Sequence, residues 1–277
     1  MERELMKNNI IEHLKKFTKH NNIFLAQRGN KAIFAALKLV KETSLKNTIL
    51  IPEQGGWITH LQYAKELRFN IKTLETNYGV INPARLKENM KDASAIIYSN
   101  PAGYYAEQPV KEIYELCRKN KVLVILDVSG CIGSGFYKGN YADMIVCSFG
   151  RWKPINLGYG GFISASNNGI FKKNKKILEN LEFDESYYAA LRQKLGNLEK
   201  RYRFFEKTNK KIKDELKNFN ILHKGKNGIN VVVKFSDDNE KNKIISYCEK
   251  NKYEFVVCPK LIRVNENAIS IEVKRLE

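Results

Sequence analysis

The stretch Ala142-Asp-Met-Ile-Val-Cys-Ser-Phe-Gly-Arg-Trp-Lys153 contains an apolar run that ends in polar residues. The run at residues 144–148 is short and apolar, which is typical of a buried strand. Lys153 follows them, next to Trp152 and shortly before a glycine-rich turn, Gly158-Tyr-Gly-Gly161. A lysine in so basic a chain is usually solvated, but a lysine desolvated in this loop would favour the neutral, imine-forming amine. We therefore take this stretch as the centre of the candidate site.

The rest of the sequence alternates between strand-like and helix-like segments. Up to residue 165, further strands are expected at 48–51, 71–74, 95–99, 122–126 and 161–165. This alternation predicts an α/β fold with a mostly parallel sheet and helices on both faces. After Ser166, lysine-rich helical sequence is followed by four short strand-like runs, at 231–235, 253–257, 261–264 and 268–273, which predict a smaller α+β C-terminal domain. We expect a large domain at 1–175 and a small one at 176–277.

Polar residues follow the predicted strands. Asp127 closes the apolar run at 122–126, Asn100 follows the strand at 95–99, and Arg28-Gly-Asn-Lys31 opens an early helix. Ligands bind beyond the carboxyl ends of parallel strands, so Asp127 is expected beside Lys153. By itself, Asp127 could be a metal ligand, a ribose contact, a partner for a cationic ring nitrogen or a helix cap. The glycines at 133–139 lack the spacing of a dinucleotide-binding fingerprint.

The composition indicates a soluble globular protein. Of the 277 residues, 43% are hydrophobic and 11% aromatic, which excludes a mainly disordered chain. No apolar run approaches the roughly 20 residues of a membrane helix, and the N-terminus lacks the apolar stretch of a signal peptide. We therefore expect a cytoplasmic protein without membrane association. Five dispersed cysteines and four scattered histidines predict neither a disulfide scaffold nor a metal site.

Basic residues outnumber acidic ones by 48 to 30, which gives a net charge of +18. Two interpretations are open: a polyanion-binding surface, or a compositional bias shared with the frequent Asn and Ile. We favour the bias, because the lysines are spread along the chain and no nucleic-acid-binding motif is present. Nucleic acid is therefore expected to bind only non-specifically, if at all.

Together, several segments resemble the fold type I pyridoxal-phosphate enzymes, the aspartate aminotransferase superfamily. In chain order they are Gly29-Asn-Lys31, Pro52 to Trp57, Ser99-Asn-Pro-Ala-Gly103, Asp127, and Ser148 to Lys153 with the glycine-rich turn. The resemblance covers about half of the chain, from Arg28 to Ala165. Its most specific piece is the stretch 142–153. The region at 52–57 and the turn at 158–161 lean toward the subgroup that includes sugar aminotransferases.

This resemblance implies pyridoxal 5′-phosphate (PLP) as the cofactor and two catalytic residues. Lys153 would form a Schiff base with the cofactor aldehyde and later act as a general base. Asp127 would hold the pyridine nitrogen protonated, so that the ring acts as an electron sink.

The resemblance also implies a set of residues that hold the cofactor. The backbone of Gly29, Asn30 and Lys31 would bind the phosphate, with Ser148 assisting and Arg151 as a further candidate. Trp57 would stack on the ring, with His60 as the second candidate. Asn100 would hydrogen-bond the ring 3′-oxygen.

The sequence also departs from the family pattern. Gly130 stands where many members carry Gln or Tyr, and the C-terminal domain is short, with Arg263 as the available partner for a substrate carboxylate. We expect an aminotransferase that acts on a small-molecule amino donor and acceptor as a homodimer. The alternatives are a PLP-dependent lyase or desulfurase-like enzyme, for which Cys131 would be invoked, and a degenerate PLP-fold protein with a non-catalytic role such as nucleic-acid binding.

Overall fold

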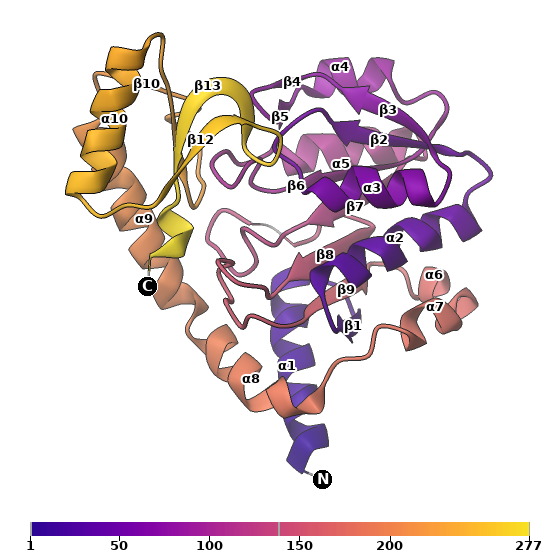
Figure 1. Ribbon diagram of the computed structural model, residues 1–277. Coiled ribbons are helices and arrows are strands. Elements are labelled where there is room, and N and C mark those ends of the chain that lie inside the picture. The colour runs from indigo at the N-terminus through magenta and orange to yellow at the C-terminus, as the bar shows by residue number, and fades with distance from the viewer. Residues whose placement is uncertain (1, 138, 277) are drawn as a thin grey trace.

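The computed structural model describes residues 2–137 and 139–276. Its larger part is built on a seven-stranded sheet with the strand order β1-β9-β8-β7-β6-β2-β3 (Figure 1). The strands are β1 (Asn22–Ala26), β2 (Thr48–Pro52), β3 (Asn70–Leu74), β6 (Ala93–Ser99), β7 (Leu123–Asp127), β8 (Met144–Ser148) and β9 (Gly161–Ala165). The five strands from β3 to β8 in this order run parallel, whereas β9 is antiparallel to both of its neighbours. The predicted mostly parallel sheet is therefore confirmed.

Helices cover both faces of this sheet. Successive residues of a strand point to opposite sides, so each strand contributes apolar side chains to both faces. Ile49 and Ile51 pack into one buried apolar cluster and Leu50 into another. The helices of the first cluster are α2 (Gly29–Thr43), α3 (Ile58–Glu66), α6 (Asn168–Lys173) and α7 (Lys175–Glu179). Those of the second are α1 (Glu2–Thr18), α4 (Pro83–Glu88), α5 (Val110–Lys119) and α8 (Tyr188–Gly196). Burial on both faces explains why the central strands are apolar at nearly every position.

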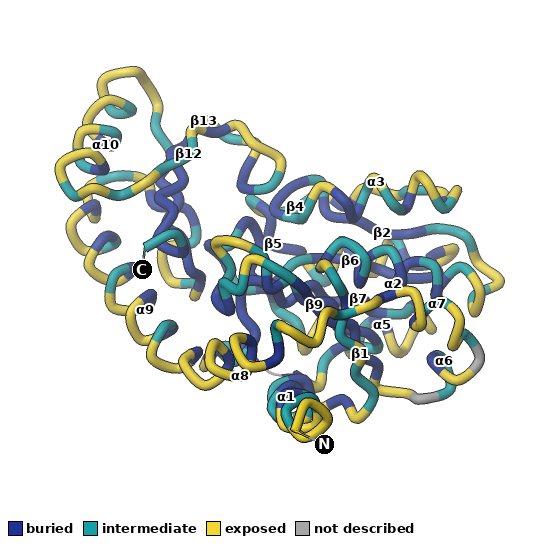
Figure 2. The backbone as a smooth tube through the Cα atoms, turned by 60° about the horizontal axis from the view of Figure 1, so that its bottom comes forward, coloured by how far each residue is buried: buried dark blue, intermediate teal, exposed yellow. Residues whose placement is uncertain are grey.

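The C-terminal part is the expected smaller α+β domain. Its antiparallel sheet has the order β10-β11-β13-β12. The strands are β10 (Asn220–Ile221), β11 (Val231–Lys234), β12 (Phe255–Lys260) and β13 (Val264–Ile271), and the helices are α9 (Leu198–Glu215) and α10 (Asp238–Lys250). The described residues also form the hairpin of β4 (Thr76–Asn77) and β5 (Val80–Ile81) and two 3₁₀ turns, η1 (Glu185–Tyr187) and η2 (Val273–Arg275). One buried apolar cluster extends from the large sheet to the small sheet. The outer sides of α9 and α10 are exposed (Figure 2).

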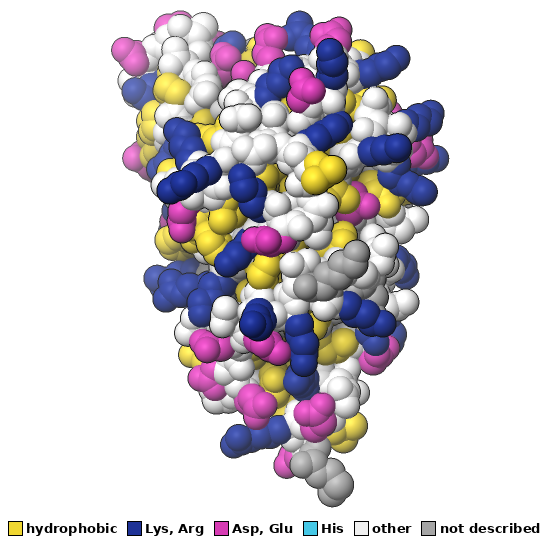
Figure 3. All heavy atoms as spheres, turned by 90° about the vertical axis from the view of Figure 1, so that its right-hand side faces the viewer, with side chains coloured by type: hydrophobic (Ala, Val, Ile, Leu, Met, Phe, Trp, Pro, Cys, Tyr) yellow, Lys and Arg dark blue, Asp and Glu magenta, His cyan; other side chains and the backbone are white. Residues whose placement is uncertain are grey.

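Several elements differ from the sequence expectation, and the short strands β4, β5 and β10 were not predicted. Strand β1 was not predicted, although its sequence Asn22-Ile-Phe-Leu-Ala26 is largely apolar; it is a short edge strand that pairs with β9 and is mostly half-buried. Of the strands expected at 261–264 and 268–273, the first is mostly a turn at residues 261–263, and β13 begins at Val264, ends at Ile271 and pairs with both β11 and β12. Among the described helices, none is long and apolar enough to cross a membrane. On the face shown in Figure 3, Lys and Arg side chains are spread among acidic and neutral ones.

Candidate functional site

The carboxyl ends of β7 and β8 lie side by side and carry the polar residues of the site. Asp127 ends β7 and Ser148 ends β8, and the two strands pair in parallel. The N-terminal ends of α2 and α3 are linked to each other here. The indole nitrogen of Trp57, just before α3, donates to Asn30 Oδ1 in α2 over 3.0 Å. From the other side, Lys153 places Nζ 4.8 Å from the centroid of the Trp57 ring. Residues far apart in the sequence thus converge at one edge of the sheet.

Asp127 is buried and hydrogen-bonded through both carboxylate oxygens. Oδ1 accepts from the Ser129 backbone nitrogen over 2.9 Å, and Oδ2 lies 3.2 Å from His60 Nε2. Burial alone would raise the pKa of this carboxyl, but the hydrogen bonds from His60 and Ser129 and the charge of His60 outweigh it and lower the pKa. Asp127 is therefore ionised at neutral pH. The Ser129 contact caps a turn and not an α-helix.

His60 presents an unsatisfied atom to the site. Its side chain is 1% exposed, and Nδ1 has no hydrogen-bond partner although Nε2 contacts Asp127. Most buried polar atoms in folded proteins are paired, so this nitrogen is an exception; it lies on the Gly56 side of the ring, 3.4 Å from where a Gly56 Cβ would be. Because His60 is occupied by Asp127, Trp57 is the better placed of the two predicted ring-stacking residues.

Lys153 is half-buried in the turn between β8 and β9. Its Nζ lies 2.5 Å from the hydroxyl of Tyr104 and 4.6 Å from the centroid of the same ring. The turn is held by a backbone bond from Lys153 to Gly150 and by the Asn156 side chain, which accepts from the Trp152 backbone. Sequence reasoning missed Tyr104 entirely, because it lies in an irregular loop and no motif marks it.

A small cavity of about 200 Å³ opens beside these residues. It is lined by Arg28, Gly29, Asn30, Ser148, Gly150, Gly158, Tyr159 and Gly160. A Cβ atom on Gly29 would lie only 2.4 Å from Ser148 Cβ, so this position requires glycine. Helix α2 begins here without a side-chain cap, which leaves backbone N–H groups of its first turn available to an anion.

Two predicted phosphate-binding residues lie outside this cavity. The side chain of Lys31 turns toward the segment after α7, where Nζ lies 3.7 Å from a Glu182 carboxylate oxygen. Arg151 is exposed and stacks over the Trp152 ring at 5.4 Å. Neither side chain lines the cavity, so the side chains of Lys31 and Arg151 are not part of the cradle.

Asn100 lies beside Asp127 at the end of β6. It is buried, its Oδ1 accepts from the Gln108 backbone over 2.9 Å, and its Nδ2 lies 3.5 Å from Cys131 Sγ. A thiol is a weak acceptor, so the Asn100 amide retains donor capacity toward a stronger one.

Two further candidates from the sequence are occupied in other ways. Arg263 is 3% exposed and forms a bidentate pair with Glu272, with both distances at 2.7 Å, so it does not present its guanidinium to a substrate carboxylate. Cys131 is fully buried, and burial raises the pKa of its thiol well above the usual range. This burial argues against Cys131 as a desulfurase-type nucleophile.

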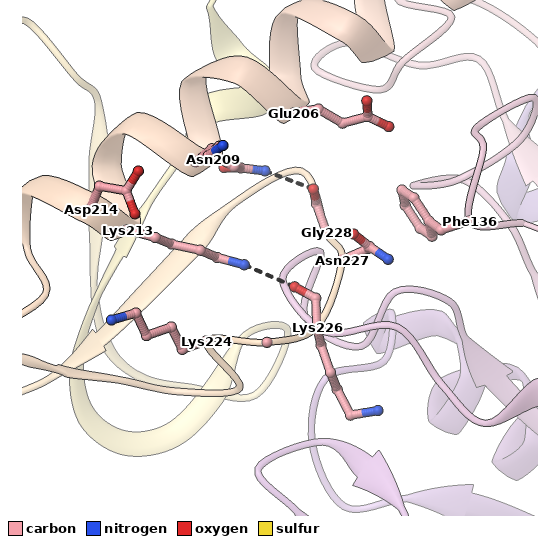
Figure 4. Close-up of a pocket in the computed structure, with 11 residues that line it drawn as sticks. Phe136, Glu206, Asn209, Lys213, Asp214, Lys224, Lys226, Asn227 and Gly228 are labelled. Atoms are coloured by element: carbon pink, nitrogen blue, oxygen red, sulfur yellow. Dashed lines mark hydrogen bonds between the residues drawn. The ribbon is translucent and has the colours of Figure 1, made fainter.

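A second hollow of about 300 Å³ lies between α9 and the turn at 224–228 (Figure 4). There Asn209 donates to the Gly228 carbonyl over 2.7 Å, and Lys213 donates to the Lys226 carbonyl over 2.8 Å. The amines of Lys224 and Lys226 point away from each other (Figure 4). These groups hold the turn against the helix and do not converge on a common point.

Two protein-family models match this chain, one over its larger part and one over its C-terminal part. Residues 7–206 match the DegT/DnrJ/EryC1/StrS aminotransferase family, and residues 199–277 match the MJ1341 family C-terminal domain. Comparison with curated proteins found no match.

Solved structures of PLP-fold proteins are similar over nearly the whole chain. Helicobacter pylori PseC, described as an aminotransferase involved in pseudoaminic acid biosynthesis, is 16% identical with a TM-score of 0.78, over 95% of this chain and 84% of that one. A 3-amino-5-hydroxybenzoic acid synthase is 12% identical with a TM-score of 0.77, over 98% and 86%. Serine palmitoyltransferase from Sphingomonas wittichii is 11% identical with a TM-score of 0.73, over 96% and 70%. At these identities the similarity shows a shared fold, fold type I, and does not show that a substrate is shared.

Proposed function

Because this chain belongs to the DegT/DnrJ/EryC1/StrS aminotransferase family, we propose that it is a PLP-dependent aminotransferase. The observation that carries the proposal is the placement of an ionised carboxylate, Asp127 at the end of β7, and a half-buried amine, Lys153 in the turn after the neighbouring strand β8, at the same edge of the sheet. A glycine-lined helix N-terminus lies beside them. This set of groups corresponds to the ring nitrogen, the aldehyde and the phosphate of the cofactor.

Features of the site support a fit to PLP. The cavity at Gly29 and Ser148 has the size and the backbone donors that a phosphate group requires. The Trp57 indole, fixed by Asn30, offers an aromatic face next to Lys153. In this assignment Gly29, Asn30 and Ser148 hold the phosphate, and Asn100 contributes a donor at the ring.

The bound cofactor would supply an electron-withdrawing ring that stabilises negative charge on the substrate carbon. Asp127 would keep a proton on the ring nitrogen, because its own pKa is lowered and it remains an anion. His60 would hold Asp127 in place through Nε2. Lys153 would bind the cofactor through Nζ and, once displaced by the amino donor, carry the proton to and from the substrate carbon. Enclosure by Trp57 would limit access of water.

A lyase acting through the same residues is the second candidate, since the amine, the carboxylate and the cradle serve either reaction. The desulfurase-like version has less support, because all five cysteines are buried. Amino donor and acceptor are small molecules in this proposal. We also propose that the protein is a homodimer, which sedimentation velocity would measure.

The test is a half-reaction. Purified protein loaded with PLP is mixed with a panel of amino acids, and the bound cofactor is recovered and analysed. Aminotransfer converts it to pyridoxamine phosphate and releases one oxo acid for each cofactor. A lyase releases donor fragments and returns PLP, whereas a degenerate protein leaves both donor and cofactor unchanged.

Asp127→Asn supplies the matched variant. We expect it to retain cofactor but to slow the half-reaction by orders of magnitude, because the carboxylate charge that protonates the ring is lost. Asp143→Asn is the control, since Asp143 accepts from the Val124 backbone and has no contact with the site. Equal half-reaction rates in the two variants would refute the role of Asp127.

A further inference from the structure

Tyr104 contacts the amine that the proposed reaction uses. Its hydroxyl lies 2.5 Å from Lys153 Nζ, and its ring is half-buried below the same amine. Tyr104 belongs to the loop after β6, whereas Lys153 belongs to the turn after β8. The contact therefore ties together two loops that share no backbone hydrogen bond at this point.

The C-terminal domain holds Tyr104 in this position. The Tyr104 carbonyl accepts from the backbone nitrogens of Ile229, over 2.7 Å, and Asn230, over 3.0 Å. Arg263 Cζ and Lys274 Nζ lie 5.0 and 4.9 Å from the centroid of its ring. Tyr104 has a φ of 71°, a left-handed conformation that is unusual for a bulky residue and persists only where its surroundings fix it. All four of these contacts come from residues of the domain that lies beside the loop in Figure 1.

Gly130 leaves the space that the Tyr104 ring fills. A Cβ atom at position 130 would lie 2.9 Å from Tyr104 Cδ1 and 2.9 Å from Pro101 Cδ. Any side chain at position 130 would therefore displace the Tyr104 ring. The missing side chain at 130 and the aromatic ring at 104 are thus complementary, and the ring supplies a hydroxyl near Lys153.

We propose that Tyr104 is a positioning residue that holds Lys153 Nζ for its reaction with the cofactor aldehyde, and that the C-terminal domain fixes Tyr104 for this role. The inference rests on the proposed function. In that reaction the amine adds to the aldehyde carbon, a C=N bond forms, and the aldehyde oxygen leaves as water. An amine held in one orientation next to a bound aldehyde reacts faster than a freely rotating one.

The experiment compares two reactions of Lys153 in Tyr104→Phe and in the parent protein. The first is formation of the borohydride-reducible adduct with PLP, followed by mass spectrometry of the Lys153 peptide. The second is methylation of Lys153 by formaldehyde and cyanoborohydride in cofactor-free protein, normalised to the other lysines. Affinity for pyridoxine phosphate, which has an alcohol in place of the aldehyde, reports binding without the covalent step.

The expected result is a divergence between the two reactions. In Tyr104→Phe the adduct with PLP should form about tenfold more slowly, because one strong hydrogen bond orienting the amine is lost. Methylation by the small, untethered reagent should become several-fold faster, because Nζ is no longer engaged. Pyridoxine phosphate should bind within about twofold of the parent. Gly130→Ala should reproduce this pattern by displacing the ring.

Tyr105→Phe is the matched control, because it removes a hydroxyl from the same loop that bonds the Tyr78 carbonyl and not Lys153. It should change neither reaction of Lys153. The inference is overturned if Tyr104→Phe leaves methylation of Lys153 unchanged, or if both reactions slow together, as general loosening of the loop would cause. If the parent protein forms no adduct with PLP but the methylation difference persists, the proposed function fails while the contact of Tyr104 with Lys153 stands.

Discussion

Lys274 gives the stability of this protein a pH dependence that can be worked out from its surroundings. The side chain is 3% exposed, and Nζ lies 3.0 Å from Glu272. Burial, and then the charges of Arg263 and Lys153, lower the pKa of Lys274 from 10.5 to about 7, although Glu272 acts in the opposite direction. Between about pH 7 and 10.5 the unfolded chain keeps a proton that the folded protein has lost.

The sign and size of the effect follow from proton linkage. Because the unfolded state binds more protons in this window, the free energy of unfolding rises with pH there, and it is flat below about pH 7 where both states are protonated. A pKa of about 7 against 10.5 corresponds to at most about 5 kcal/mol over the whole window. We expect about 2 kcal/mol of this between pH 7 and 9.

The assay is urea unfolding of the parent and of Lys274→Met at several pH values. Other titrating groups are common to both proteins, so their contributions cancel in the difference. The parent should gain about 2 kcal/mol on the variant between pH 7 and 9, a figure set by the slope of about 1.4 kcal/mol per pH unit for one proton. Lys119→Met, at an exposed position at the end of α5, should show no such trend. A difference that is independent of pH, or that changes in the opposite direction, would refute the reasoning.

Three further outcomes are expected. Gly29→Ala should weaken PLP binding in equilibrium dialysis at least tenfold, because the new Cβ would lie 2.4 Å from Ser148 Cβ, whereas Gly135→Ala, whose Cβ would contact nothing, should have no effect. Glu272→Gln should lower the free energy of unfolding in urea by about 3–5 kcal/mol at pH 7, because Arg263 would lose its buried carboxylate partner. Since the pKa of Glu272 is lowered to about 2, this difference should shrink as the pH falls from 4.5 toward 2. Unrelated DNA duplexes should bind with similar, weak and steeply salt-dependent affinities in fluorescence anisotropy, and selective binding at physiological salt would contradict this.

The sequence was most informative where an apolar strand ends in a polar residue. The runs before Asp127 and Ser148 are apolar because both faces of the sheet are covered, and parallel pairing then brings their ends together. Gly29 was recognisable because a helix that opens with glycine allows close backbone approach. These features predicted the fold and the placement of the central residues.

Long-range pairing was beyond the reach of sequence patterns. Tyr104 meets Lys153 only because the C-terminal domain holds its loop, and no local pattern encodes that contact. The sequence offers Arg263 for substrate binding, but the fold pairs its guanidinium with Glu272, a partner nine residues away in the same buried strand region that no sequence pattern indicates.

The central claim, that Lys153 carries the cofactor, is tested most directly by locating the covalent bond. The protein is incubated with PLP, reduced with borohydride and digested, and the peptides are analysed by mass spectrometry. The account predicts a single modified residue, Lys153, and no stoichiometric adduct in a folded Lys153→Ala variant. An adduct on a different lysine, or equal low-level modification of many lysines, would contradict it.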